Sequence, residues 1–130
     1  MQHSEEGYPE EVCGVMLSPS DTSDLVISLR RMKNSHDGPR QSRYSIDPME
    51  LYAADNEATK EGMLIVGIYH SHPDSPAKPS KFDLDHSFPW YKYVITSVVE
   101  GKVKDTRCWA MNNDRTAFME EAIVEVEIRK

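Results

Sequence analysis

The sequence has few cysteines, no long hydrophobic run and no basic excess, and each shortage excludes a class of protein. Two cysteines, Cys13 and Cys108, are too few for a disulfide framework and favour a reducing, cytoplasmic setting. No apolar run approaches the roughly 18–20 residues that a membrane span needs. The polar, acidic start, MQHSEEGYPEE, is unlike a signal peptide. Acidic residues outnumber basic ones 22 to 15, so we expect neither a membrane nor a nucleic acid as partner.

The length of 130 residues predicts one domain that spans residues 1–130. A chain of this size buries a core without a disulfide or a metal ion as a staple. We find no internal repeat and no low-complexity linker that would divide it.

Hydrophobic patterns predict a mixture of strands and helices. Asp47 before Pro48 is typical of a helix start, and Gly62 predicts its end near Glu61. A second, short helix is expected to begin at Ser80. Strands are predicted over residues 12–17, 25–32, 44–46, 63–70, 91–99, 106–111 and 118–128, with a turn at 18–21 and a proline-rich loop at 72–79. This mixture indicates an α+β fold with a helix packed on a sheet.

Two histidines stand where the most apolar predicted strand ends. Residues i and i+2 of a strand point to the same face, so His70 and His72 present two imidazoles side by side. Pro73 then ends the strand, because it cannot donate to the ladder. The pair is suited to chelating one ion, although such pairs also occur as surface or core polar structure.

Asp83 is the favoured third ligand. Two histidines and one carboxylate leave the fourth tetrahedral position of a zinc ion open to water, as in catalytic zinc sites. Zinc lowers the pKa of that water toward about 7. His86, three residues further on, could share the same helix face and replace Asp83, and Asp74 and Asp85 are also near in sequence.

A hydrolytic site also needs a base and an oxyanion donor. Glu11, at the edge of the first apolar run, is a candidate base, although composition does not distinguish it among 22 acidic residues. Ser80 could donate to an oxyanion, a contribution of roughly 3–4 kcal/mol. Ser80 and Asp83 also fit a helix capping box, which is compatible with function. Cys13 is interpreted as a small buried apolar residue rather than a nucleophile.

The spacing of these residues resembles a known motif. His70-Ser71-His72-Pro73, then Ser80 after seven residues and Asp83 after two more, match H-x-H-x7-S-x2-D, the JAMM motif of zinc metallopeptidases with the JAB1/MPN fold. In that family a glutamate precedes two apolar residues and a glycine, as in Glu11-Val12-Cys13-Gly14. The resemblance implies one zinc ion on His70, His72 and Asp83 rather than His86, with Glu11 as base and Ser80 as oxyanion donor.

Three segments, 8–14, 43–48 and 67–73, resemble the compact prokaryotic branch of this family. The branch includes Mec-type peptidases, which release cysteine from the C-terminus of a ubiquitin-like sulfur carrier protein. The resemblance implies a cytidine-deaminase-like mixed sheet flanked by helices in an α/β/α sandwich. It also implies a carrier ending in Gly-Gly as partner and hydrolysis of a peptide or isopeptide bond at its tail. The family usually has a strand and a longer helix before Tyr8-Pro9, so we expect a shortened N-terminus.

Two other functions compete with this prediction. A non-catalytic MPN-type scaffold that binds a ubiquitin-like protein would typically lack the motif, which this chain retains. A nuclease is disfavoured by the acidic charge, and a deaminase requires a Cys-x-x-Cys pair that Cys13 and Cys108 are too far apart to form. The sequence leaves a homodimer open as the assembly.

Overall fold

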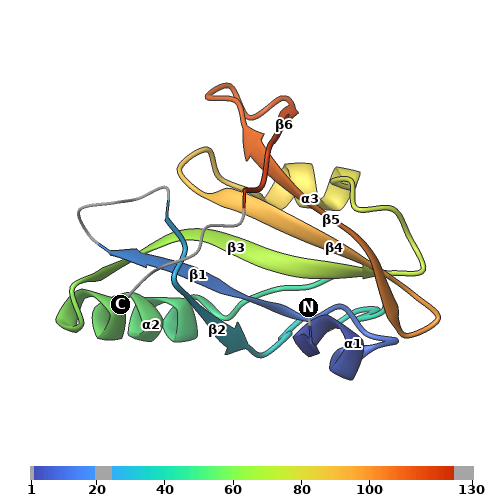
Figure 1. Ribbon diagram of the computed structural model, residues 1–130, viewed down its shortest axis with the longest axis horizontal. Coiled ribbons are helices and arrows are strands. Elements are labelled where there is room, and N and C mark those ends of the chain that lie inside the picture. Colours follow the sequence, from blue (N-terminus) through green and yellow to red (C-terminus); the bar gives the residue numbers. More distant parts are fainter. Residues whose placement is uncertain (1, 20–24, 125–130) are drawn as a thin grey trace.

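The computed structural model describes residues 2–19 and 25–124, and within them six strands form one mixed sheet in the order β2-β1-β3-β4-β5-β6 (Figure 1). Only β3 and β4 are parallel; the other neighbours are antiparallel. The strands are β1 (Cys13–Pro19), β2 (Ser28–Met32), β3 (Met63–Pro73), β4 (Lys92–Val99), β5 (Lys102–Met111) and β6 (Phe118–Glu121). The helices are α1 (Gln2–Gly7), α2 (Pro48–Lys60) and α3 (Lys81–His86).

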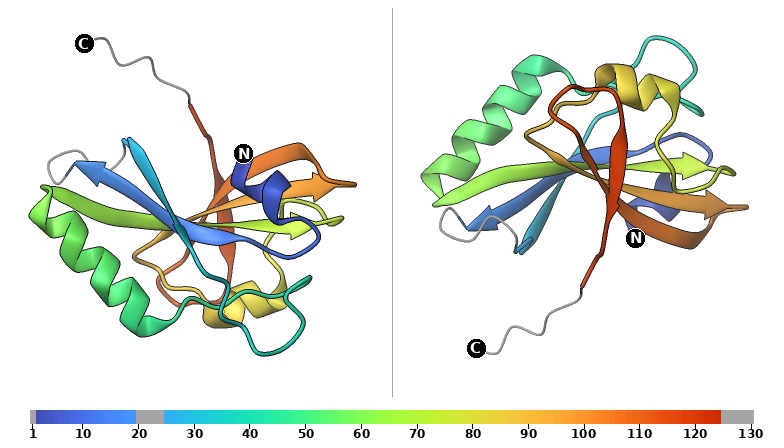
Figure 2. Two further views of the ribbon diagram at one scale, coloured as in Figure 1. Left: turned by 90° about the horizontal axis from the view of Figure 1, so that it is seen from below. Right: turned by 90° about the horizontal axis from the view of Figure 1, so that it is seen from above.

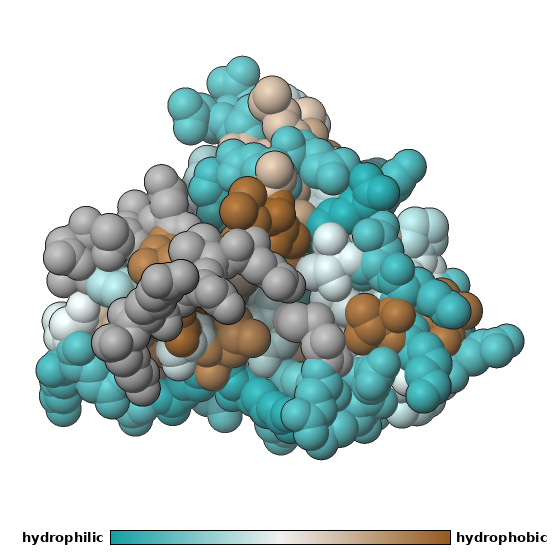
Figure 3. Space-filling model, viewed as in Figure 1, coloured by the Kyte–Doolittle hydropathy of each residue, from teal (hydrophilic) through white to brown (hydrophobic). Residues whose placement is uncertain are grey.

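Helices cover both faces of the sheet unequally. Figure 2 shows α2 and α3 on one face and the short α1 on the other. Figure 3 looks onto the α1 face, where apolar patches lie among a mostly hydrophilic surface. The predicted α+β fold, a mixed sheet flanked by helices, is therefore confirmed. No helix within the described residues is both long and apolar enough to cross a membrane.

The sequence around α2 defines both of its ends. The Asp47 carboxylate accepts a hydrogen bond from the Met49 backbone N–H at 2.8 Å, and Pro48 occupies the first turn. Gly62 follows the helix with a φ of 73°, a conformation that glycine adopts without steric cost. Two alanines of the helix, Ala54 and Ala58, are its buried residues. The predicted limits of this helix are thus confirmed to within a residue.

The core lies between α2 and the sheet and leads directly to the histidine pair. Val15, Leu17, Ile68 and Tyr93 pack with Ala58 in this core. Because side chains alternate along a strand, the two histidines that follow Ile68 at intervals of two residues lie on this same face. Tyr69 and Ser71 point to the α1 face.

Several strand limits differ from those predicted. β3 continues through Pro73, so His72 is a strand residue and the proline-rich loop starts after it. β1 runs to Pro19, where a turn was expected, and β2 starts at Ser28 rather than at residue 25. β5 begins at Lys102, not at residue 106, because Glu100 and Gly101 form a two-residue hairpin loop with φ of 51° and 81°.

Three other predictions need correction. Residues 44–46 form no strand, because the Ser45 N–H donates to the Asn34 side chain at 3.2 Å instead of to a ladder. The final strand ends at Glu121, residues 122–124 are irregular, and residues 125–128 lie outside the described part. Helix α1 was not predicted; its six residues include only one buried side chain, Ser4, and give no helical apolar pattern.

Candidate active site

Three donor atoms converge on one point at the carboxyl end of β3. His70 Nε2 lies 3.1 Å from His72 Nε2, and Asp83 Oδ2, from α3, lies 3.3 and 3.1 Å from these two atoms. The ligand atoms of a tetrahedral zinc ion, each about 2.0–2.1 Å from the metal, are separated by about 3.3 Å. The side chains therefore already have the spacing that such an ion requires.

All three side chains are buried, with exposed fractions of 1% for His70, 6% for His72 and 4% for Asp83. Burial opposes ionisation of Asp83, but hydrogen bonds with both imidazoles outweigh it and hold the pKa of the carboxyl well below its usual range. Burial lowers the pKa of His70. For His72, hydrogen bonds to Asp83 and to the Pro76 carbonyl outweigh burial and raise the pKa. The anionic carboxylate of Asp83 thus faces two imidazoles in a site that is shielded from solvent.

The second nitrogens of the two imidazoles differ in their surroundings. His72 Nδ1 donates to the Pro76 carbonyl at 2.9 Å, which in the neutral imidazole leaves the Nε2 lone pair directed at the cluster. His70 Nδ1 is buried and has no hydrogen-bond partner among the described residues. Its ring is instead held by stacking on Tyr44, with ring centroids 4.4 Å apart. Tyr44 is a site residue that the sequence did not reveal.

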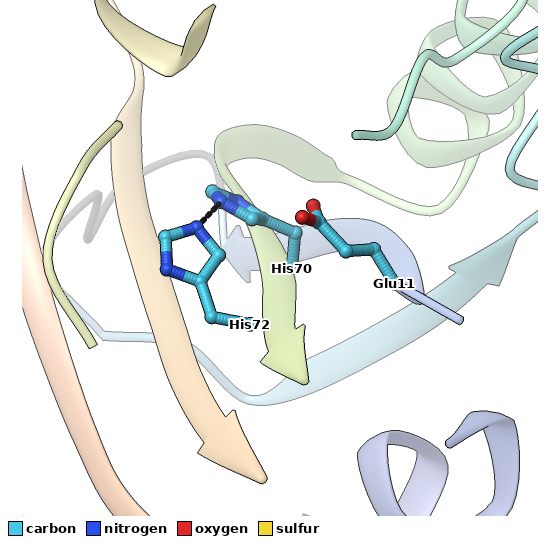
Figure 4. A group of neighbouring side chains, drawn as sticks. All are labelled: Glu11, His70 and His72. Atoms are coloured by element: carbon cyan, nitrogen blue, oxygen red, sulfur yellow. Dashed lines mark hydrogen bonds between the residues drawn. The ribbon is translucent and has the colours of Figure 1, made fainter. Parts of the chain in front are cut away.

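Glu11 approaches the two histidines from the start of β1 (Figure 4). A carboxylate oxygen and one nitrogen of each imidazole all lie within 4.8 Å of one another. The side chain is 5% exposed, and its Oε1 atom has no partner among the described residues. Burial, with a smaller contribution from Asp83, raises the pKa of Glu11 to about 8. This carboxyl group therefore lies beside the donor cluster with one oxygen unpartnered among the described residues, at a distance suited to a bridging water.

Ser80 caps α3 and also borders the open side of the site. Its Oγ accepts the Asp83 N–H at 3.1 Å, and Asp83 Oδ2 accepts the Ser80 N–H at 2.9 Å, so the predicted capping box is present. The hydroxyl proton stays available for donation. Ser80 is exposed and lines a cavity together with Glu11 and His72.

The rival candidates point elsewhere. His86 is exposed, donates from Nδ1 to the Phe82 carbonyl at 2.8 Å and stacks on the Phe82 ring. Asp74 accepts a hydrogen bond from the Tyr8 hydroxyl at 2.6 Å. Burial raises the pKa of the Cys13 thiol to about 12, which disfavours the thiolate and a nucleophilic role.

Residues 1–112 match the family described as prokaryotic homologs of the JAB domain. The chain belongs to this family. It is 36% identical over 102 residues to the desampylase of Haloferax volcanii, which covers 75% of this chain and 72% of that protein. It is 38% identical over 64 residues to a probable TtuB-protein conjugate cleaving protease of Thermus thermophilus, and the match covers 49% of this chain and 43% of that protein. It is 37% identical over 93 residues to the Lys-63-specific deubiquitinase BRCC36 of Xenopus tropicalis, and the match covers 63% of this chain and 34% of that protein.

Solved structures share the fold of this chain. A protein from Salinibacter ruber, 40% identical, superimposes with a TM-score of 0.72 over 96% of this chain and 84% of its own. A JAB1/MPN domain protein from Archaeoglobus fulgidus, 18% identical, superimposes with a TM-score of 0.55 over 95% and 89%, and shares the fold. The chain is therefore an enzyme of the prokaryotic JAMM/MPN peptidase family.

Within this JAB-family fold, Ser71 joins the segment that carries Glu11 to the strand that carries the two histidines, a contact that the sequence did not reveal. Its Oγ accepts the Val12 N–H at 2.9 Å, and its N–H donates to the Val12 carbonyl at 3.1 Å. Ser71 lies between the two histidines and Val12 directly follows Glu11. These two bonds fix the start of β1 against the end of β3.

Proposed function

We propose that this JAB-family protein is a zinc-dependent peptidase that cleaves the bond between the C-terminal tail of a ubiquitin-like protein and an amine. The relatives named as a desampylase, a conjugate-cleaving protease and a deubiquitinase support this class of substrate. We favour a small sulfur carrier protein ending in Gly-Gly as the natural partner. In the simplest arrangement, residues 1–130 act as one catalytic domain.

The convergence of His70, His72 and Asp83, with Glu11 beside them, carries the proposal. Two imidazoles and one carboxylate are the donor set of an open catalytic zinc site. Three such groups spaced at 3.1–3.3 Å are what a bound cation would require. The unsatisfied Glu11 Oε1 and His70 Nδ1 are polar atoms that a core selected for stability alone would pair or remove.

In the proposed mechanism a bound zinc ion would supply Lewis-acid polarisation of the scissile carbonyl and acidify the attacking water. The Glu11 carboxylate accepts a proton from that water and returns it to the nitrogen of the leaving amine. Ser80 Oγ donates a hydrogen bond to the oxygen that becomes negatively charged. The buried walls around Glu11 exclude bulk water, which strengthens each of these interactions.

The cavity beside the cluster is large enough to admit part of a peptide tail. It measures about 440 Å³ and is lined by Glu11, Gln41, Ser42, His72, Pro73, Ser75, Pro76, Lys78 and Ser80. A tail ending in two glycines has no side chains to keep its backbone away from the donor cluster. Close approach of a Gly-Gly backbone to the donor cluster is therefore part of the proposal.

The test compares two substrates of one carrier. The zinc-loaded protein is incubated with a Gly-Gly carrier joined to a lysine side chain of a peptide, and with the same carrier extended by cysteine. Mass spectrometry identifies the products. We expect cleavage directly after the second glycine; the preferred substrate separates isopeptide removal from amino-acid release.

Glu11→Gln and Asp83→Ala should both abolish turnover, because the first removes the base and the second a ligand. The two variants should differ in metal content, since only Asp83→Ala loses a ligand. Full activity after zinc removal, or in Glu11→Gln, would exclude the mechanism.

A further inference from the structure

The loop that joins β2 to α2, residues 34–46, reaches all parts of the candidate site. Gln41 and Ser42 line the cavity, and Tyr44 stacks on His70. The Arg40 carbonyl accepts the Glu11 N–H at 2.6 Å. The Arg43 guanidinium lies 4.8 Å from the centre of the ring of Phe82, the neighbour of Asp83. This 34–46 loop therefore forms one wall of the cavity and contacts the base and the surroundings of two donors.

Besides the backbone bond between Arg40 and Glu11, the side chain of Asn34 ties this loop to Glu11. Asn34 Nδ2 donates to the Glu11 carbonyl at 3.0 Å and to the Arg43 carbonyl at 3.0 Å. Asn34 Oδ1 accepts the N–H groups of His36 at 3.1 Å and Ser45 at 3.2 Å. Both donor hydrogens and both acceptor lone pairs of the amide are thus engaged, all with backbone groups.

Only an amide of this length satisfies the four groups. Aspartate has nearly the same shape but would place a carboxylate oxygen against two carbonyl oxygens without a proton to share. Such a full set of bonds, reaching across 23 residues to Glu11, is more than loop closure needs. The Ser35 N–H and the Ser45 carbonyl already close the loop at 2.8 Å.

We propose that Asn34 is a positioning residue that locks the 34–46 loop to the backbone of Glu11, so that the base and the cavity wall move as one unit. The catalytic consequence rests on the proposed function; the mechanical coupling does not. The four hydrogen bonds of the Asn34 side chain all go to backbone groups and none to the donor cluster. Asn34 acts by holding the Glu11 backbone while Ser71 holds the next residue from β3.

Asn112 provides a matched control. It is half-buried like Asn34 and organises the β5–β6 hairpin in a similar way. Its Nδ2 donates to Thr116 Oγ1 at 2.8 Å, and its Oδ1 accepts the N–H groups of Thr116 and Ala117 at 2.8 and 3.2 Å. These contacts involve none of the residues of the donor cluster.

The experiment compares Asn34→Asp with Asn112→Asp in the full-length chain loaded with zinc. The substrate is a Gly-Gly ubiquitin-like protein joined to a lysyl peptide. Misplacing a catalytic group by an ångström costs about 100-fold in rate, so we expect a loss of that order in kcat for Asn34→Asp, with zinc affinity unchanged. Asn112→Asp should leave kcat intact, because its contacts involve none of the residues of the donor cluster. Equal kcat values for the two variants would overturn the catalytic role.

Amide hydrogen exchange tests the coupling without any substrate. Asn34→Asp should accelerate exchange at Glu11 and in residues 35–45 together, whereas Asn112→Asp should not. Unchanged exchange at Glu11 would refute the tether even if activity fell. If the wild-type protein hydrolyses neither of the two carrier substrates, the proposed function fails, while this exchange result still decides whether the tether exists. Asn34→Ala replaces the aspartate variant if the latter does not fold.

Discussion

The surroundings of Glu11 disfavour the charged form of its carboxyl group. A carboxyl group that is 5% exposed, with one oxygen unpartnered, is destabilised in its charged form. That cost falls on the folded protein alone, because the unfolded chain hydrates the same carboxylate. The arrangement suits a base that must exchange a proton during each reaction cycle.

The stability of the metal-free protein should therefore depend on pH through Glu11. Its pKa is about 8 in the folded state against 4.5 as the ordinary value, so between these limits the folded state binds a proton that the unfolded state has lost. Stability falls as pH rises through this window. Glu11→Gln cannot ionise and should gain stability relative to the wild type, by roughly 3–5 kcal/mol at pH 8 and above, with little gain below pH 5.

Urea unfolding of the zinc-free proteins from pH 5 to pH 9 measures this difference. Glu10→Gln, one residue away at a half-exposed carboxylate paired with Arg40, controls for removal of a charge from the same segment. A difference between wild type and Glu11→Gln that does not change with pH would show that burial of this carboxyl is not the cause.

Helix α3 is the element in which structure and chemistry overlap most closely. It has only six residues, so its own backbone bonds stabilise it little, and its start depends on the capping box. The same Asp83 oxygen that accepts the Ser80 N–H faces both imidazoles. The helix start and the donor cluster therefore share one carboxylate oxygen.

Two substitutions at Ser80 should separate capping from catalysis. Glycine is nearly as good as serine at an N-cap, whereas alanine costs about 1 kcal/mol. Loss of the hydroxyl should lower kcat by about 100- to 1,000-fold in both Ser80→Gly and Ser80→Ala, if it donates to the oxyanion. Only Ser80→Ala should also lower the melting temperature appreciably. Steady-state kinetics beside calorimetry make the comparison, and a normal kcat in Ser80→Gly would leave capping as the only role of Ser80.

Elements with a local signal could be predicted from the sequence, and those that depend on distant partners could not. The strand alternation brought His70 and His72 together, and Asp47, Pro48 and Gly62 defined α2. Glu11 needed the family resemblance, because nothing in its local sequence shows that it is buried. Asn34 gave no signal at all, since its partners are backbone groups. The predicted strand at 44–46 failed for the same reason: that side chain replaced the ladder.

At the scale of the whole molecule, the donor cluster joins two elements of the fold and lies beside Glu11, which comes from a distant part of the chain. It links the end of the central strand β3 to α3, with Glu11 at the start of β1 close by (Figures 1 and 4). A ligand that binds only the folded arrangement stabilises the entire fold by mass action. Zinc should therefore act as a cross-link between these segments.

Zinc at 100 times its dissociation constant should raise the free energy of unfolding by about 2.7 kcal/mol. We expect a concentration-dependent rise in melting temperature with zinc, reversed by a chelator, and a much smaller one with magnesium. His72→Ala, which removes one donor from the strand, should abolish most of the rise. An equal zinc response in His72→Ala would mean that the ion binds elsewhere.

The capping box of α3 also affects which site residues should persist in homologues that have lost activity. In a descendant released from selection for hydrolysis, Ser80 and Asp83 would still be retained, because the start of the helix depends on them. The opposite holds for Glu11. Because replacing it by a neutral residue removes the cost of burying a carboxylate, this position should be the first to change. The presence of the serine and the aspartate in a homologue therefore does not show that it is an active enzyme. The upstream glutamate is the better position for distinguishing active peptidases from inactive homologues.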